Sequence, residues 1–250
     1  MVKYYDSVPD NLRDWMLDQP VFFTASAPTT GKHINISPKG LPSSTFTIFT
    51  PNLAAYIDAT GSGCETISHI YENGRITIMF CSFEASPRIM RLFCTGRVVE
   101  WDQLEFQKLL GRMGGKKVEG ARAVIVLDIF KVQTSCGYGV PLLTLTPTGS
   151  PYLRDRETMG HWASKKVATN QLHAYQAEWN HDSLDGLTGL KTARRDHGEK
   201  VLWVKDAEVV VRGALGRKDY WIVAGLASAG TAVACAVGMW VWGLRGVLHE

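Results

Sequence analysis

Residues 121–133 read ARAVIVLDIFKVQ, and this stretch decides the fold class. Its run from Val124 to Phe130 is apolar on both faces except at Asp128. Such a run predicts a barrel strand that packs inward on a core and outward on a helix or on a second subunit. Upstream runs alternate apolar and polar residues, as half-buried strands do. They cover residues 21–26, 34–37, 45–50, 54–59, 75–83 and 89–101. The sequence therefore predicts a mainly β (α+β) domain.

Three short helices are predicted, one before the first strand and two between later strands. One begins near Ser7 and presents an apolar face, and the others cover residues 64–73 and 102–113. In the last of them, Asp102 and Glu105 have the spacing of a capping box, in which two side chains satisfy the free N–H groups at a helix start.

The overall composition predicts one main domain with an appendage. Of the 250 residues, 45% are apolar, which is enough for one well-filled core. We place this domain at residues 1–147 and a charged, helix-leaning extension at residues 148–219. The formal charge is only +3, and no block of like charges appears, so the sequence predicts no nucleic-acid partner.

The cysteines and histidines indicate neither a disulfide framework nor a metal site. The five cysteines are odd in number and never form a C-x-x-C pair, which favours a reducing compartment. His161, His173 and His181 are spaced 12 and 8 residues apart, which matches no standard metal motif. The first ten residues lack the apolar run of a signal peptide. A cytosolic location of the main domain is therefore expected.

The C-terminal region has the pattern of a single membrane span at residues 220–244, followed by a short tail at 245–250. The 24 residues from 221 to 244 carry no charge and would reach about 36 Å as a helix, although a buried core helix is the alternative. Tyr and Trp lie at both ends, and most flanking Lys and Arg precede the span, which predicts a tail anchor with the N-terminal domain in the cytosol. The sequence does not indicate which membrane.

Five blocks of sequence resemble the pyridoxamine 5′-phosphate oxidase-like family. They are VFFTAS (21–26), HINISPKG (33–40), YIDATGSG (56–63), ENGRITIMF (72–80) and GRV (96–98). The resemblance covers about residues 8–140. The segment QTSCGYGVP (133–141) after the last strand is similar to a fungal-type branch of this family.

The resemblance implies a six-stranded split β-barrel that forms a homodimer and binds flavin mononucleotide (FMN) in a groove between the subunits. The flavin ring would accept hydride or electrons, and the protein would supply position, exclusion of water and hydrogen bonds. No side chain is thereby identified as catalytic.

Residues 60–63, Thr-Gly-Ser-Gly, are the best candidate for the flavin phosphate, because they join a strand to a helix start. Glycines allow close approach of the backbone, and free N–H groups at a helix start attract phosphate. Alternatively, Ser62 and Glu65 form a capping box that satisfies the same N–H groups without a ligand.

The cations that hold the phosphate in the enzyme that names the family are missing here. Its basic loop pair falls near Glu65 and Thr66, and the preceding strand carries Phe46, Ile48 and Phe49 instead of basic residues. Other cations could replace them. The predicted cofactor-binding residues are Lys39, Thr60, Gly61, Ser62, Gly63, Thr66 and Arg75; Arg88 and Arg91 are further cations that could face the groove or simply be solvated.

Three functions follow from these patterns. The first is a membrane-tethered FMN-dependent oxidoreductase that acts on an unknown small substrate. The second is a haem-binding split barrel, with His33 or His69 as the iron ligand. The third is a non-catalytic tethered barrel that has lost the cofactor.

Overall fold

A computed structural model describes residues 2–216 of the chain. The described part of the chain divides into two compact units, with the boundary between residues 161 and 162. The predicted membrane span at 220–244 and the tail at 245–250 lie outside the described residues. Within residues 2–216, no helix is both long and apolar enough to cross a bilayer.

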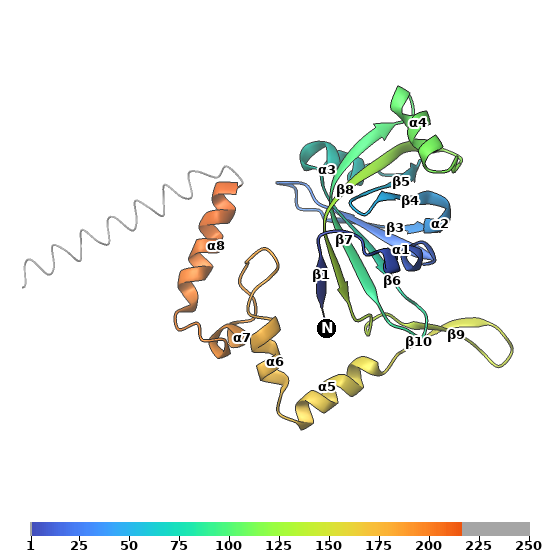
Figure 1. Ribbon diagram of the computed structural model, residues 1–250. Helices are drawn as coiled ribbons and strands as arrows, with labels where there is room; N and C mark the ends of the chain where they lie inside the picture. Colours follow the sequence, from blue (N-terminus) through green and yellow to red (C-terminus); the bar gives the residue numbers. More distant parts are fainter. Residues whose placement is uncertain (1, 217–250) are drawn as a thin grey trace, which may run out of the picture. The chain divides into compact units, whose positions relative to one another are not determined.

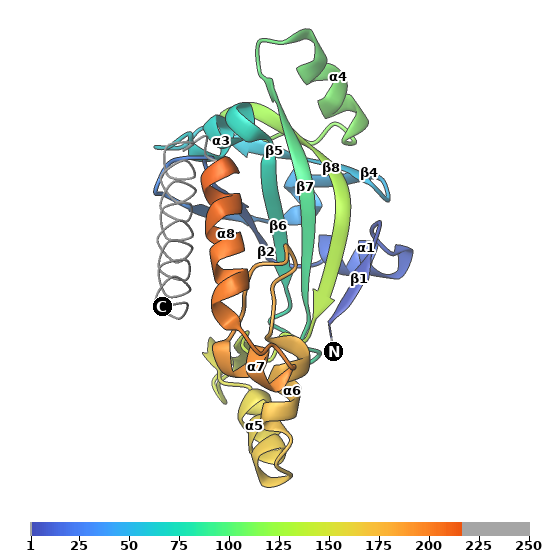
Figure 2. The ribbon, with the colours of Figure 1, turned by 90° about the vertical axis from the view of Figure 1, so that its left-hand side faces the viewer.

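The first unit contains one sheet of eight antiparallel strands, curled into a half barrel (Figure 1). Its strands are β1 (Lys3–Tyr5), β2 (Val21–Ser26), β3 (Asn35–Gly40), β4 (Phe46–Thr50), β5 (Leu53–Ala59), β6 (Arg75–Cys81), β7 (Ile89–Glu100) and β8 (Ala121–Ser135). Their order is β3-β2-β6-β7-β8-β5-β4, and β1 pairs with the end of β8. The long strands β6, β7 and β8 run side by side (Figure 2). The mainly β fold is confirmed, with eight strands in the sheet rather than six.

Four helices accompany the sheet: α1 (Asp10–Leu17), α2 (Pro42–Thr45), α3 (Glu65–Asn73) and α4 (Leu104–Arg112). On β8, Ile125 belongs to the barrel core, whereas its neighbour Val124 packs with Phe106 and Leu109 of α4. The prediction that this strand packs inward on a core and outward on a helix is therefore confirmed.

The capping box predicted at the start of α4 is wrong. The N-cap residue is Gln103, and no side chain caps the helix. Instead, the carboxylate of Glu105 accepts two hydrogen bonds from the guanidinium of Arg97 on β7, at 2.7 and 2.8 Å. An ion pair with another element has taken the place of the local cap.

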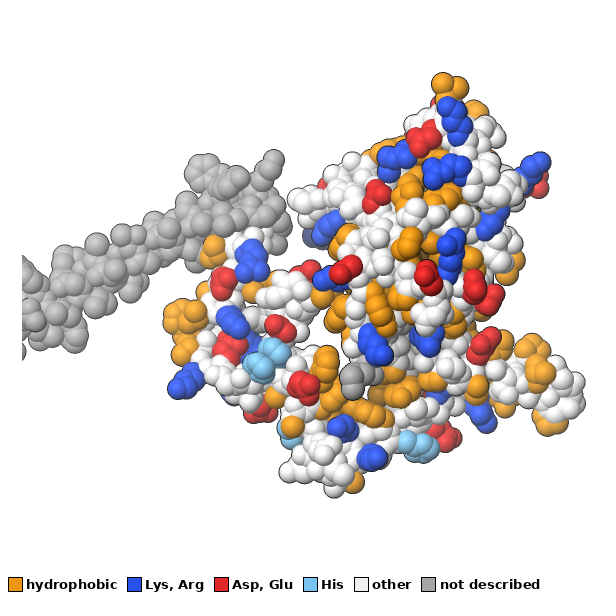
Figure 3. Space-filling view, viewed as in Figure 1, with side chains coloured by type: hydrophobic (Ala, Val, Ile, Leu, Met, Phe, Trp, Pro, Cys, Tyr) orange, Lys and Arg blue, Asp and Glu red, His pale blue; other side chains and the backbone are white. Residues whose placement is uncertain are grey.

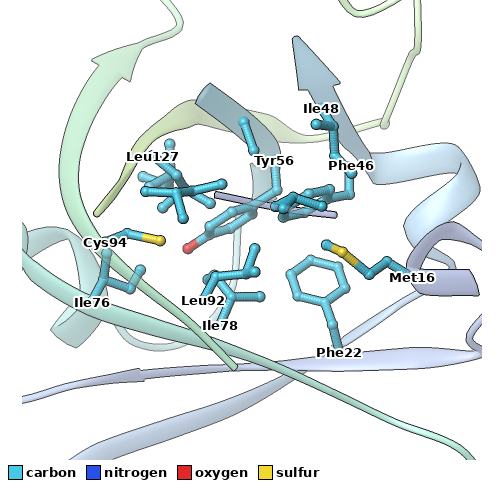
Figure 4. Close-up of a cluster of buried hydrophobic side chains, with 14 of the residues drawn as sticks. Met16, Phe22, Phe46, Ile48, Tyr56, Ile76, Ile78, Leu92, Cys94 and Leu127 are labelled. Atoms are coloured by element: carbon cyan, nitrogen blue, oxygen red, sulfur yellow. The ribbon is translucent and has the colours of Figure 1, made fainter. Parts of the chain in front are cut away.

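The centre of the barrel is a cluster of buried aromatic side chains (Figure 4). The ring of Phe22 lies 5.4 Å from Phe46, 5.6 Å from Tyr56 and 5.6 Å from Phe80, measured between centroids. The Tyr56 hydroxyl points towards the side of the cluster where Cys94 lies and has no hydrogen-bond partner among the described residues. Burial accordingly raises the pKa of Tyr56 well above its ordinary value.

A small hairpin follows the barrel strands. It consists of β9 (Leu142–Leu145) and β10 (Pro151–Arg154), which pair antiparallel across the predicted boundary at residue 147. The helix α5 (Thr158–Ala168) comes next along the chain.

The second unit continues with α6 (Leu172–Trp179), α7 (Lys191–Asp196) and α8 (Leu202–Gly216). Its organising residue is Arg194, which is 2% exposed. The guanidinium pairs with Glu199 at 2.7 Å and with Asp206 at 2.6 Å, and it also donates to the carbonyl of Leu202. One buried cation thus ties α7 to α8 and to the turn between them.

The described cysteines divide into two pairs of different reactivity. Cys64 and Cys136 are exposed free thiols, whereas Cys81 and Cys94 are buried, and burial raises the pKa of both buried thiols. Because the thiolate is the reactive form, we expect iodoacetamide to modify Cys64 and Cys136 in the folded protein. Peptide mass mapping should find Cys81 and Cys94 unmodified until urea is added. Equal labelling of all four would contradict the burial.

Candidate functional site

A polar cavity of about 430 Å³ lies in the first unit, where β3, β5 and β8 come together beside the start of α3. Ligand pockets in proteins commonly have volumes of about 300–1,000 Å³. Its lining comes from β3, β5, the turn before α3, α3 itself and β8: Asn35, Ser37, Lys39, Asp58, Ala59, Gly61, Ser62, Gly63, Glu65, Thr66 and Arg122. The lining side chains are mostly polar: an ammonium, a guanidinium, two carboxylates, an amide and three hydroxyl groups.

Strand β3 supplies one wall of the cavity through its alternation. Asn35, Ser37 and Lys39 are half-buried and share one face of the strand, while Ile36 and Pro38 point to the other face and are exposed. The polar members of the alternating pattern therefore face the cavity. This edge strand thus presents three hydrogen-bonding side chains in a row.

Asp58 is the centre of the charged part of the site. It is 2% exposed, and its two carboxylate oxygens accept from Lys39 Nζ and from Arg122 Nε, each at 2.8 Å. The side chains of both cations remain 25% exposed. A buried carboxylate thereby fixes two cations that are themselves open to the cavity.

A β-bulge explains why Arg122 reaches this carboxylate. Asp58 pairs with Ala123 and Ala59 pairs with Ala121, so Arg122 stands opposite no single residue of β5. An extra residue of this kind bends the strand and redirects its side chain. The bulge at the start of β8 thus brings a second cation to a wall already carrying Lys39.

The first turn of α3 forms the opposite side of the cavity. Thr66 Oγ1 accepts a hydrogen bond of 2.9 Å from Asn35 Nδ2, which links the helix to β3. The N-cap residue is Cys64, and no side chain caps the helix. The alternative capping box between Ser62 and Glu65 is therefore wrong.

Five of the predicted cofactor-binding residues line this one cavity: Lys39, Gly61, Ser62, Gly63 and Thr66. Thr60 flanks it, and both its N–H and its hydroxyl donate to the carbonyl of Gly120, at 2.7 and 2.8 Å. Arg75 is not among the lining residues. Its N–H bonds Asn73, and its guanidinium reaches the carbonyl of Pro28 at 3.5 Å.

The sequence did not identify Asp58 and Arg122 as site residues. Asp58 carried a signal, because it is a charged residue in the otherwise apolar or small run of β5. Nothing in the sequence marks Arg122, because its position depends on a bulge, and a bulge cannot be located from the composition of the strand. Asn35 and Ser37 were visible only as the polar half of an alternating pattern.

The remaining predicted cations and histidines have other partners. Arg88 lies over the ring of Trp15 at 5.3 Å, and Arg91 donates to Gln133. His69 is buried, with Nδ1 2.9 Å from Ser26 Oγ, whereas His33 is exposed. Neither histidine lines the cavity, and no cluster of three potential metal ligands occurs within residues 2–216.

The donors of the cavity fit a phosphate monoester such as that of FMN. Lys39 Nζ and Arg122 Nε each use one N–H on Asp58, so both groups keep further donors for a ligand. The hydroxyls of Ser37, Ser62 and Thr66 add neutral hydrogen-bonding groups around them. Hydrogen bonds from Lys and Arg to phosphate are the strong, charge-assisted kind.

Solved structures similar to this chain come from several bacteria. HupZ of group A Streptococcus is 18% identical with a TM-score of 0.42, covering 51% of this chain and 99% of that one. The haem storage protein HutZ of Vibrio cholerae is 12% identical with a TM-score of 0.36, covering 49% and 90%. An FAD binding protein of Mycobacterium smegmatis is 8% identical with a TM-score of 0.37, covering 52% and 97%.

The sequence comparisons are more specific. The family model described as pyridoxamine 5′-phosphate oxidase matches residues 8–136, just over half of the chain. The pyridoxamine 5′-phosphate oxidase family protein ustO of Aspergillus flavus is 56% identical over 205 residues, which cover 80% of this chain and 82% of that protein. The chain therefore belongs to the pyridoxamine 5′-phosphate oxidase family.

Proposed function

We propose that this protein is an FMN-binding oxidoreductase that acts on a small substrate of unknown identity. The observation that carries the proposal is the pair Lys39 and Arg122, fixed on the buried carboxylate of Asp58 at the wall of a polar cavity. These two cations supply the positive charge whose usual carriers in the family are absent from this sequence. Membership in the family supports the choice of a flavin.

In this proposal the chain's own groups hold and orient the cofactor. Lys39 and Arg122 bind the phosphate, and Asp58 keeps both cations in place before the ligand arrives, which lowers the entropy lost on binding. Asn35 and Thr66, joined by a hydrogen bond, keep β3 and α3 together around the site. The bound flavin would supply the hydride or electron chemistry.

The visible spectrum of the purified protein tests the proposal. We expect flavin absorption, or a rise in melting temperature on addition of FMN to colourless protein. Replacing either cation, as Lys39→Met or Arg122→Met, should weaken FMN binding by about tenfold or more, since each removes a charge-assisted contact. A Soret band would favour the haem-binding alternative. Colourless protein that ignores FMN would leave only a barrel without a cofactor.

A homodimer is part of the proposal. Figure 3 shows apolar side chains exposed between charged ones on the visible face of the molecule. On the edge strand β3, Ile36 is 65% exposed, and the residues that flank the strand, Ile34 and Leu41, are 74% and 61% exposed. A second copy of the chain could bury these side chains. Light scattering should give twice the monomer mass, and Ile36→Lys should shift the protein towards monomer.

Membrane tethering is the last element and rests on sequence. The uncharged segment 220–244 is long enough to cross a bilayer, with the preceding domain on the cytosolic side. The full chain should remain in the membrane pellet after carbonate extraction, and a chain ending at residue 216 should appear in the supernatant. Release of both forms would contradict the tether.

A further inference from the structure

We infer that the carboxylate of Glu65 competes with the anionic group that the cavity binds. A phosphate ester must therefore displace this carboxylate to bind fully. The inference rests on the proposed function, because it assumes that Lys39 and Arg122 receive a phosphate. It adds a residue that limits the affinity of the same site.

The carboxylate of Glu65 lies close to Gly63. A Cβ placed on Gly63 would overlap Oε2 of Glu65 and lie 3.1 Å from its Cδ and 3.2 Å from its Oε1. The carboxylate is therefore folded back against the backbone of the turn that precedes α3. Only a residue without a side chain at position 63 permits this arrangement.

The charges around the cavity show the consequence. Its lining contains two cations, Lys39 and Arg122, and two carboxylates, Asp58 and Glu65, so the formal charges cancel. Asp58 is buried and engaged by both cations, and its charge fixes them in place. Glu65 makes no such pair in the described structure, and its charge opposes an incoming anion without organising the site.

Displacement of Glu65 is physically easy. The residue is exposed and begins the helix, where an acidic side chain interacts favourably with the free N–H groups and the helix dipole. A phosphate held by Lys39 and Arg122 near this helix start would supply the same favourable charge. The protein therefore loses little when the carboxylate swings into solvent, and the ligand gains the space that it leaves.

The direct test is Glu65→Gln, which keeps the size of the side chain and removes its charge. We expect FMN and inorganic phosphate to bind about fivefold more tightly, and riboflavin, which lacks the phosphate, to bind unchanged. That factor corresponds to about 1 kcal/mol, the repulsion of two charges a few ångströms apart in a water-like medium. The difference between variant and wild type should shrink with added salt, because exposed charges are screened.

The matched control is Glu84→Gln. Glu84 is also exposed, and it follows the end of β6 that is remote from α3, outside the cavity. The change in net charge is identical, so a purely global effect of charge would appear in both variants. We expect the FMN affinity of Glu84→Gln to equal that of the wild type.

Gly63→Ala provides a second, independent way to move the carboxylate. The backbone of Gly63 is not in the left-handed region, so alanine meets no conformational strain there, and its Cβ collides only with the flexible end of Glu65. This variant should also bind FMN more tightly, and in the Glu65→Gln background it should add nothing.

The possible outcomes separate the inference from the proposed function. If wild type binds FMN and Glu65→Gln binds it no more tightly, the competitor role is wrong while the flavin site stands. If no variant binds FMN or phosphate, the cavity is not an anion site, and both conclusions fall. FMN binding by the wild type, and tighter binding by Glu65→Gln, would support both.

Discussion

Replacing Phe22 with alanine is expected to lower the free energy of unfolding by about 4 kcal/mol, the usual cost of removing a buried aromatic ring. Phe22 is completely buried and contacts three other aromatic rings at centroid distances of 5.4 to 5.6 Å. Two of these contacts are edge-to-face pairs, which contribute beyond the buried area. Urea denaturation followed by circular dichroism measures the loss.

The same substitution at Phe130 is the control. Phe130 lies on β8 but is 61% exposed, so Phe130→Ala should change the free energy of unfolding by less than about 1 kcal/mol. Similar losses at the two positions would mean that the cluster in Figure 4 is not the centre of the core.

Elements with a regular pattern could be predicted from the sequence. Strand β2 alternates half-buried and fully buried residues along its whole length, and this is the pattern read at residues 21–26. The apolar residues Leu12 and Met16 are one helical turn apart and are both buried. In such segments the local pattern and the final burial agree, because one face meets the core.

Elements stabilised mainly by distant partners could not be predicted. Strand β1 has only three residues, and Lys3 pairs with Thr134, more than a hundred residues further along the chain. Every residue of β10 is exposed, and no residue of its partner β9 is fully buried, so neither strand has a face in the core.

Both predicted capping boxes failed for a related reason. Glu105 bonds Arg97 on β7, and the carboxylate of Glu65 lies against Gly63. A capping box is worth about 1 kcal/mol, so a bidentate ion pair or a favourable packing position can replace it. A Ser or Asp three residues before a Glu therefore indicates where a helix starts more reliably than it indicates which side chain caps the helix.

The charged centre of the site illustrates the limit of sequence reasoning about function. Lys39 and Asp58 both lie in quoted motifs, but Arg122 lies in none. Arg122 reaches Asp58 through the pairing of β5 with β8 and the bulge at the start of β8. The three residues come from three strands. Their meeting point depends on the pairing of separate strands and on a bulge, and the composition of one strand does not locate a bulge.

Asp58 should therefore be the residue on which both stability and ligand binding depend. In Asp58→Asn, Lys39 and Arg122 lose their shared counter-charge, and the two cations face each other across the cavity wall. Breaking a buried ion pair typically costs about 3–5 kcal/mol, and because both cations are 25% exposed we expect a loss of about 2–3 kcal/mol in the free energy of unfolding. FMN binding should weaken as well, because the cations are no longer held in position.

The exposed ion pair between Arg97 and Glu105 provides the control for Asp58→Asn. Glu105→Gln breaks a carboxylate–arginine pair of equally good geometry, but the side chains of Arg97 and Glu105 are 51% and 46% exposed. Exposed pairs contribute less than about 1 kcal/mol, so this variant should unfold nearly like the wild type and bind FMN normally. Equal losses in the two variants would show that burial of Asp58 is not the source of its importance. A large loss only in Asp58→Asn would show that the buried carboxylate contributes far more than an exposed one of similar geometry.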